Sequence, residues 1–179
     1  MGQNGESPME IWDLYHRDGH PAGLDHVRGE PLPKGLYHLV CDVILRHADG
    51  DFLLMRRAFD KPIYPGFWEL TAGGSALKGE TPLDCARREL LEETGLAARD
   101  FREIAFTIDD DNGCLYHSFV AFTDAPKDAV RLQEGETVDY RWIDIDGLRA
   151  FLRSGEAIER TVRRCAAFLR DEIHLETDL

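Results

Sequence analysis

Apolar residues in the first half of the chain fall into short runs that have the length of strands rather than of helices. Two of these runs, 36–46 and 52–57, are separated by Ala48-Asp49-Gly50-Asp51, which contains the Asp-Gly pair of a tight β-hairpin. A third and shorter run covers 67–70. We therefore predict a β-hairpin followed by a short strand.

The chain before residue 36 has a weaker pattern. Residues 10–15 and the turn pair Asp18-Gly19 predict an N-terminal hairpin, and Pro21, Gly23, Pro31 and Pro33 predict irregular chain after it. The first eight residues are polar and glycine-rich, so we expect them to be disordered. The predicted organisation is a tail over 1–8, an N-terminal extension over 9–35 and one domain over 36–179.

A helical pattern begins shortly after residue 80. The segment Thr81-Pro82-Leu83-Asp84 offers an N-cap residue, a proline at the first helical position and a capping-box partner. Apolar residues then recur at helical spacing until Gly95, which is typical of the position just past a helix end. Gly73 and Gly74 precede this segment and allow the backbone to pass close to a ligand. We predict a glycine loop that leads into a short helix.

The second half of the chain repeats the order of strands and then helices. Runs at 101–108 and 115–122 are joined through Asp111-Asn112-Gly113, and 138–143 forms a last strand. Helical spacing follows over 145–153 and over 157–173. The predicted fold class is therefore α+β, with a mixed β-sheet sandwiched between helices.

Composition limits the classes of protein that fit. The 179 residues suffice for one domain with a full core, and no stretch approaches the roughly 18 apolar residues of a membrane span. The formal net charge of −13 opposes binding to nucleic acid. We expect a cytoplasmic protein that binds neither nucleic acid nor membrane. Its four cysteines are widely spaced and are expected to be free thiols, namely Cys41, Cys85, Cys114 and Cys165.

The predicted helix carries the candidate chemistry. Glu89, Glu92 and Glu93 fall within one sector, roughly opposite the apolar stripe. Like charges at this spacing destabilise a helix slightly unless a cation lies beside them, and a hard divalent cation prefers oxygen ligands. Arg88 can hold a carboxylate through a forked hydrogen bond. The alternatives are a solvated helix face and an ordinary surface ion pair.

Residues 74–96 place these side chains in the order G-x5-E-x7-R-E-L-x-E-E-x-G-L. This spacing resembles the signature box of the Nudix hydrolases without a gap or a substitution. The resemblance implies the Nudix fold and hydrolysis of a diphosphate with Mg²⁺ or Mn²⁺. It also implies that Glu89 or Glu93 takes the proton from the attacking water. The implied metal ligands are Glu89, Glu92 and Glu93, helped by the Gly73 carbonyl and by Glu80.

Three other segments, 19–26, 56–69 and 136–148, resemble the isopentenyl diphosphate isomerases and their hydrolase-like relatives within the same superfamily. That resemblance implies that Arg57 and Lys61 contact the substrate diphosphate, whereas two solvated surface cations are the alternative.

This chain departs from the isomerase pattern at the positions that carry the catalytic and metal-binding residues of the isomerases. Isomerases have a catalytic cysteine where this chain has Gly73 and a ligand histidine where it has Ser75. They also carry two glutamates on a strand where this chain has Leu115 and His117. Isomerisation of an alkene needs an acid and a base on opposite faces of the double bond, and these groups are missing.

Three further sets of residues have two interpretations each. His26 and His38 lie near the positions of the isomerase metal histidines but with a longer separation, and structural roles are the alternative. His117 is a candidate substrate contact or an ordinary cross-strand residue. Glu136 is a candidate fourth metal ligand or base, or a plain loop glutamate.

The resulting hypothesis is a divalent-metal-dependent hydrolase of a nucleoside diphosphate derivative or another small organic pyrophosphate. Glu89, Glu93 and Arg88 are its predicted catalytic residues. An isopentenyl diphosphate isomerase and a non-catalytic nucleotide-sensing module are the alternatives. The N-terminal extension is a candidate contact for a homodimer.

Overall fold

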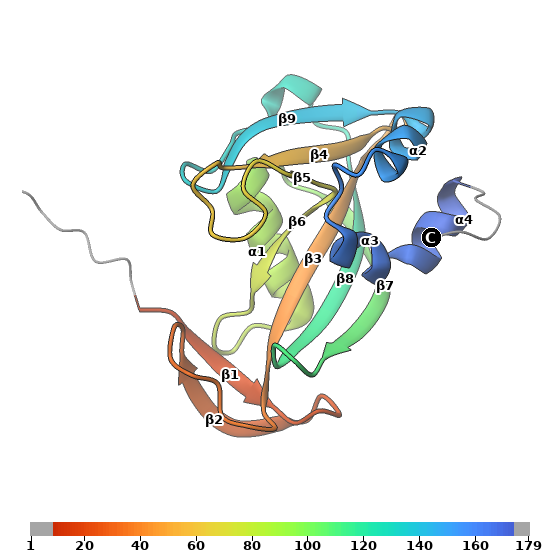
Figure 1. Cartoon of the computed structure of the whole chain (residues 1–179). Coiled ribbons are helices and arrows are strands. Elements are labelled where there is room, and N and C mark those ends of the chain that lie inside the picture. Colours follow the sequence, from red (N-terminus) through yellow and green to blue (C-terminus); the bar gives the residue numbers. More distant parts are fainter. Residues whose placement is uncertain (1–8, 174–179) are drawn as a thin grey trace, which may run out of the picture.

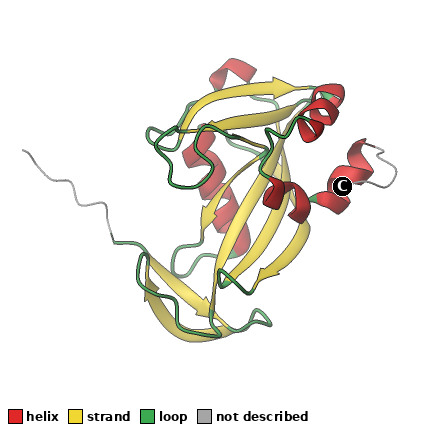
Figure 2. Ribbon diagram, in the orientation of Figure 1, coloured by secondary structure: helices red, strands yellow, loops and turns green. Residues whose placement is uncertain are grey.

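Strand β3 (Tyr37–His47) is the central strand of a nine-stranded mixed sheet in the computed structural model, which describes residues 9–173 (Figures 1 and 2). It pairs in parallel with β8 (Cys114–Thr123) over ten residues and antiparallel with β6 (Thr71–Ser75). The outer strands are β4 (Phe52–Arg57), β7 (Arg99–Asp109) and β9 (Thr137–Ile143). The expected tail over residues 1–8 lies outside the described residues.

The two faces of the sheet hold two cores, because side chains alternate along a strand. Cys41, Val43 and Leu45 of β3 pack in the core that contains α1 (Pro82–Thr94). Ile44 packs on the other face, against α2 (Ile145–Arg153) and α4 (Ala166–Ile173). The predicted sheet between helices is confirmed. No helix among residues 9–173 combines the length and the apolar character needed to cross a membrane.

Helix α1 begins and ends where the sequence predicts. The Thr81 hydroxyl accepts the Asp84 amide, and the Asp84 carboxylate accepts the Thr81 amide, so the capping box is complete. Gly95 ends the helix with a φ of 68°, in the left-handed region that favours glycine.

The N-terminal hairpin is present but is longer than predicted. Its strands are β1 (Ile11–Tyr15) and β2 (Pro21–Val27), so Pro21 and Gly23 lie in a strand rather than in irregular chain. Pro21 is tolerated because it is the first residue of an edge strand. Strand β1 also pairs with the start of β3, so the extension continues the sheet.

The predicted glycine loop is wrong, since Gly73 and Gly74 lie within β6. The short strand predicted at 67–70 is only β5 (Trp68–Glu69), and β6 follows it directly. A Cβ atom at Gly73 would lie 2.1 Å from the Cys41 carbonyl oxygen. The glycines therefore serve a close approach of two strands, which hydrophobic patterning does not reveal.

The single helix predicted over 157–173 is also wrong. The structure has α3 (Glu159–Arg164) and α4, separated at Cys165, whose ψ of 7° departs from helical geometry. Ala157 instead forms a β-bridge with Trp68. The break lets α4 pack Phe168 and Leu169 into the core.

The capping box gives a prediction for stability. Thr81→Ala removes the side-chain acceptor for the Asp84 amide, and we expect it to lower the free energy of unfolding by about 1 kcal/mol. Chemical denaturation would measure the change. Thr81→Ser is the matched control because it keeps the hydroxyl, and an equal loss in both variants would contradict the assignment of the cap.

Candidate active site

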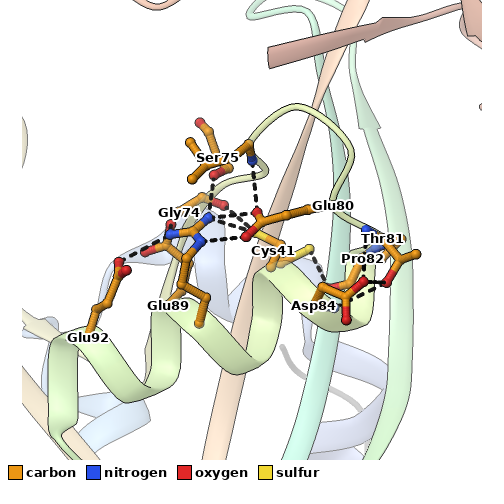
Figure 3. A network of polar contacts seen from close by, with 12 residues as sticks. Cys41, Gly74, Ser75, Glu80, Thr81, Pro82, Asp84, Glu89 and Glu92 are labelled. Carbon is orange, nitrogen blue, oxygen red and sulfur yellow. Dashed lines mark hydrogen bonds and ion pairs between the residues drawn. The ribbon is translucent and has the colours of Figure 1, made fainter. Parts of the chain in front are cut away.

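Arg88 of α1 is the centre of a polar network, and its partners Glu80, Glu89 and Glu92 are labelled in Figure 3. Its Nε and Nη2 atoms donate to the two carboxylate oxygens of Glu80 at 2.6 and 2.9 Å. Its Nη1 atom donates to Glu89 at 2.7 Å and to Glu92 at 3.1 Å, and Nη2 also donates to the Ser75 carbonyl. One guanidinium therefore joins three of the box glutamates to the end of β6.

Glu80 has no free oxygen in this network. In addition to the two hydrogen bonds from Arg88, its Oε2 atom accepts the Leu77 amide at 2.8 Å. Burial alone raises the pKa of Glu80, but the hydrogen bonds from Arg88 and Leu77 hold it below its ordinary value. This geometry suits a residue that positions Arg88, and it leaves the predicted role as an additional metal ligand without support.

Glu89 and Glu93 lie between α1 and β6, close to the two glycines. The Glu89 side chain is 14% exposed, and a Cβ atom at Gly74 would lie 2.5 Å from its Oε1 atom. Burial raises the pKa of Glu89, and Arg88 opposes that rise. Burial, and then the charges of Glu69 and Glu89, raise the pKa of Glu93 well above its ordinary value.

Glu92 differs from these two carboxylates because its side chain is 47% exposed at the rim of the network. The prediction that all three carboxylates lie opposite the apolar stripe needs correction. Glu89 and Glu93 adjoin the buried face of the helix, because β6 approaches so closely that the carboxylates are enclosed rather than solvated.

Glu69 on β5 joins the group, and sequence analysis missed it as a site residue. Its side chain accepts Arg57 Nη1 at 3.0 Å, and burial raises its pKa. The available signal was an acidic residue within an apolar run directly before the box. Of the predicted phosphate contacts, Arg57 therefore borders the carboxylates, and Lys61 forms an ion pair with Glu136.

The donor chemistry of this site fits a hard divalent cation. The enclosed carboxylate of Glu93 is repelled by those of Glu69 and Glu89, and oxygen donors of this kind are the ligands that Mg²⁺ and Mn²⁺ prefer. A ready-made shell is absent, however: no three acidic, histidine or cysteine side chains in residues 9–173 are arranged as a metal site. Arg88 instead satisfies part of the negative charge.

A cleft of about 140 Å³ opens beside Gly73, on the sheet face opposite α1. Its lining includes Arg57, Glu69 and Gly73 from the sheet and Arg160 and Arg164 from α3. Sequence analysis missed the arginines of α3, because a regular helix over 157–173 gave no reason to single them out. The site thus combines carboxylates from α1 and β5 with cations from β4 and α3.

The predicted substrate residue His117 does not reach this cleft. It belongs to the α1 side of β8, where its Nδ1 atom lies 2.7 Å from Glu103 Oε1, and it borders a separate hollow with Glu80 and Thr81. A role in substrate binding stays a prediction that this placement does not support. The interpretation of His117 as a cross-strand residue agrees better with its contacts.

His26 and His38 also lie away from the carboxylates. His38 stacks on Trp12 with ring centroids 4.2 Å apart, and burial lowers its pKa to about 4. His26 is buried beside the same tryptophan and contacts the Glu30 carbonyl. Both histidines hold the N-terminal hairpin against the sheet, in accord with the structural alternative.

Comparisons with known proteins identify the family to which this fold belongs. A family model described as NUDIX domain matches residues 36–165. An uncharacterized Nudix hydrolase of Listeria monocytogenes is 36% identical over 151 residues, which cover 84% of this chain and 89% of that protein. An isopentenyl-diphosphate Delta-isomerase of Dinoroseobacter shibae is 34% identical over 129 residues, which cover 68% of this chain and 72% of the relative.

A Deinococcus radiodurans protein of known crystal structure has the same fold, with a TM-score of 0.68 at 22% identity. The alignment covers 87% of this chain and 99% of that one. The resemblance inferred from the box and its flanking segments is thus confirmed. Because the family model matches well over half of the chain, and the Listeria relative is more than 30% identical, the chain belongs to the NUDIX domain family.

Proposed function

We propose that this protein hydrolyses the diphosphate linkage of a small organic pyrophosphate, with Mg²⁺ or Mn²⁺ as its cofactor. The observation that carries the proposal is the juxtaposition of the enclosed carboxylates of α1 and β5 with Arg57. Anionic phosphates approach a chain of net charge −13 only where cations compensate locally. The carboxylates of α1 offer a place for a divalent ion, and the cleft beside Gly73 offers cations for the phosphates.

Glu89, Glu92 and Glu93 would hold the ion, with the Gly73 carbonyl beside them. When bound, the ion supplies neutralisation of the charge on the diphosphate oxygens. Arg57 and Lys61 bind the phosphates in this proposal. Their present partners are Glu69 and Glu136, so the substrate exchanges one set of oxygen acceptors for another. Glu136 remains the proposed fourth carboxylate of the site.

In the proposed reaction, the oxygen of a water molecule forms a bond to one phosphorus atom as that atom loses its bond to the bridging oxygen. The water proton passes to a carboxylate of α1, and the bridging oxygen leaves with the second phosphate. We assign the proton acceptor to Glu93, because Glu89 and Glu92 both accept hydrogen bonds from Arg88. Arg88 fixes the positions of its partners and does not take part in proton transfer.

Hydrolysis is favoured over isomerisation, although a relative named as an isomerase covers two thirds of this chain. The positions that would supply acid and base to an alkene hold Gly73, Leu115 and His117, and neither a glycine nor a leucine side chain can donate or accept a proton. Deuterium incorporation into isopentenyl diphosphate would revive the isomerase. Tight nucleotide binding without turnover in either metal would favour the sensing module.

The first prediction of this proposal concerns the three carboxylates. We expect Glu89→Gln, Glu92→Gln and Glu93→Gln each to lower metal-dependent turnover by at least about 100-fold, because each removes a charged oxygen donor or the proton acceptor. Release of phosphate-containing products from a panel of organic pyrophosphates would measure it. Glu156→Gln is the control, since it removes the same charge from an exposed pair with Arg141. Full activity in all three variants would show that the site lies elsewhere.

The second prediction concerns Arg88. Arg88→Lys keeps the charge but loses the fork that binds Glu80, so we expect Mn²⁺ affinity to fall about 10- to 100-fold, as for other residues that orient metal ligands. Paramagnetic resonance of free Mn²⁺ during titration measures the affinity directly. The neighbouring Arg87 is exposed, and Arg87→Lys should bind Mn²⁺ like the unaltered protein. Equal affinities for all three proteins would contradict the positioning role.

A further inference from the structure

The turn between β6 and α1 lies against the N-terminal hairpin of β1 and β2. This turn covers residues 77–80 and is closed by the Glu80 amide, which donates to the Leu77 carbonyl at 3.0 Å. Figure 1 shows the loop between β6 and α1 beside the hairpin. The family model matches residues 36–165, so the hairpin lies outside the matched domain and yet contacts the segment that leads into α1.

The hairpin holds the turn through its backbone. The Lys78 amide donates to the Ile11 carbonyl of β1 at 2.7 Å, and the Gly79 amide donates to Asp13 Oδ2 of β1 at 2.6 Å. The two central amides of such a turn take no part in the hydrogen bond that closes it, so they need partners from elsewhere. Because both partners belong to β1, this strand fixes the position of the turn.

The same turn carries the carboxylate that binds Arg88. Glu80 is its last residue, and Glu80 Oε2 accepts the Leu77 amide at 2.8 Å, so the side chain is fixed to the turn. The two oxygens of Glu80 accept Nε and Nη2 of Arg88. Arg88 in turn donates to Glu89 and Glu92. A continuous path of covalent and hydrogen bonds therefore connects β1 with the carboxylates of α1.

A second contact between the hairpin and the turn is of a different kind. Asp25 of β2 is the cross-strand partner of Asp13, and its Oδ2 atom accepts Lys78 Nζ at 2.5 Å. The Lys78 and Asp25 side chains are 52% and 53% exposed, and ion pairs of this kind stabilise a structure little. Asp25 thus binds a flexible side chain, whereas Asp13 binds the backbone of the turn directly.

We propose that Asp13 is a positioning residue of the active site. By holding the turn at residues 77–80, Asp13 keeps Glu80 and Arg88 in the geometry that arranges the carboxylates of α1 for a divalent cation. Residues that orient metal ligands change metal affinity even though they do not touch the ion. This inference rests on the proposed hydrolase function, and it gives the N-terminal hairpin a part in ion binding without contact with the substrate.

The test measures the Mn²⁺ affinity of the full chain by paramagnetic resonance. Asp13→Ala removes the acceptor for the Gly79 amide, and we expect the affinity to fall about 10-fold, the lower end of the effect for residues that orient metal ligands. Asp13→Asn removes the same charge but keeps an oxygen acceptor, so it should stay within about threefold of the unaltered chain. Asp25→Ala removes the same charge from the neighbouring strand and should stay within about twofold.

A second measurement needs no metal. We expect the Arg88 Nε–H group to exchange its hydrogen with water at least about 5-fold faster in Asp13→Ala than in the unaltered chain, because Glu80 is held less firmly. Nuclear magnetic resonance measures this rate, and the loss of the signal in Arg88→Lys identifies it. Asp13→Asn and Asp25→Ala should leave the rate unchanged. An unchanged rate in Asp13→Ala would contradict the connection between the hairpin and Arg88.

Thermal unfolding separates a local role of Asp13 from a global one. We expect the unfolding midpoint of Asp13→Ala to fall by no more than about 4 °C, because the variant loses one hydrogen bond at the surface. Complete unfolding of this variant at the temperature of the metal titration would refute the positioning role, since Asp13 would then support the whole fold.

The outcomes separate the two proposals. If Arg88→Lys weakens Mn²⁺ binding but Asp13→Ala binds Mn²⁺ like the unaltered chain, the role of the hairpin is refuted and the hydrolase proposal stands. Equal losses in Asp13→Ala and Asp13→Asn would also refute that role, because they would reflect the lost charge rather than the lost acceptor. If the unaltered chain binds no Mn²⁺, the metal site itself is refuted, and the positioning role fails with it.

Discussion

The close approach of β6 to β3 is the constraint on which the rest of the site depends. Gly73 leaves no room for a side chain against the Cys41 carbonyl, and Gly74 leaves none against the Glu89 carboxylate. The first contact sets how near β6 lies to the centre of the sheet, and the second sets how near α1 lies to β6. The carboxylates of α1 are enclosed as a result, and their negative charges are brought together at a strand that also borders the cleft.

Enclosure of several carboxylates would be unfavourable without compensation, and Arg88 provides much of it. A guanidinium is suited to this task because its planar fork can satisfy two oxygens of one carboxylate and still reach others. Arg88 donates to both oxygens of Glu80, to Glu89 and to Glu92. It also donates a hydrogen bond to the Ser75 carbonyl. The protein thus holds the negative charges close together through one cation that is itself fixed by the backbone.

Much of the fold could be predicted from local patterns. The limits of α1 follow from a capping box and a C-terminal glycine, and β4 and α2 follow from the length and spacing of apolar runs. Two features could not be read in this way. The strand at Gly73 depends on contact with a distant strand, and the break at Cys165 depends on how α4 reaches the core. Both are tertiary effects that override local preference.

The same distinction applies to the site. The sequence alone allows four site residues to be predicted, because they share one helix and a recognisable spacing: Arg88, Glu89, Glu92 and Glu93. Asp42 and Arg164 are 122 positions apart and meet only when the sheet is assembled. A lone aspartate in the apolar run of β3 was a visible irregularity, but its partner could not be named without the fold. Contacts between residues far apart in the chain are the features that local sequence patterns predict least well.

The break at Cys165 divides the C-terminal region into two helices, of which one packs in the core and the other lines the cleft. Helix α4 is anchored in the core through Phe168 and Leu169, whereas α3 contributes Arg160 and Arg164 to the lining of the cleft beside Gly73. Amino-acid replacements on the exposed side of α3 therefore need not disturb the packing that holds the sheet together. The exposed side of α3 contributes little to the core. Substitutions there can therefore change which ligand the protein binds while the scaffold stays the same.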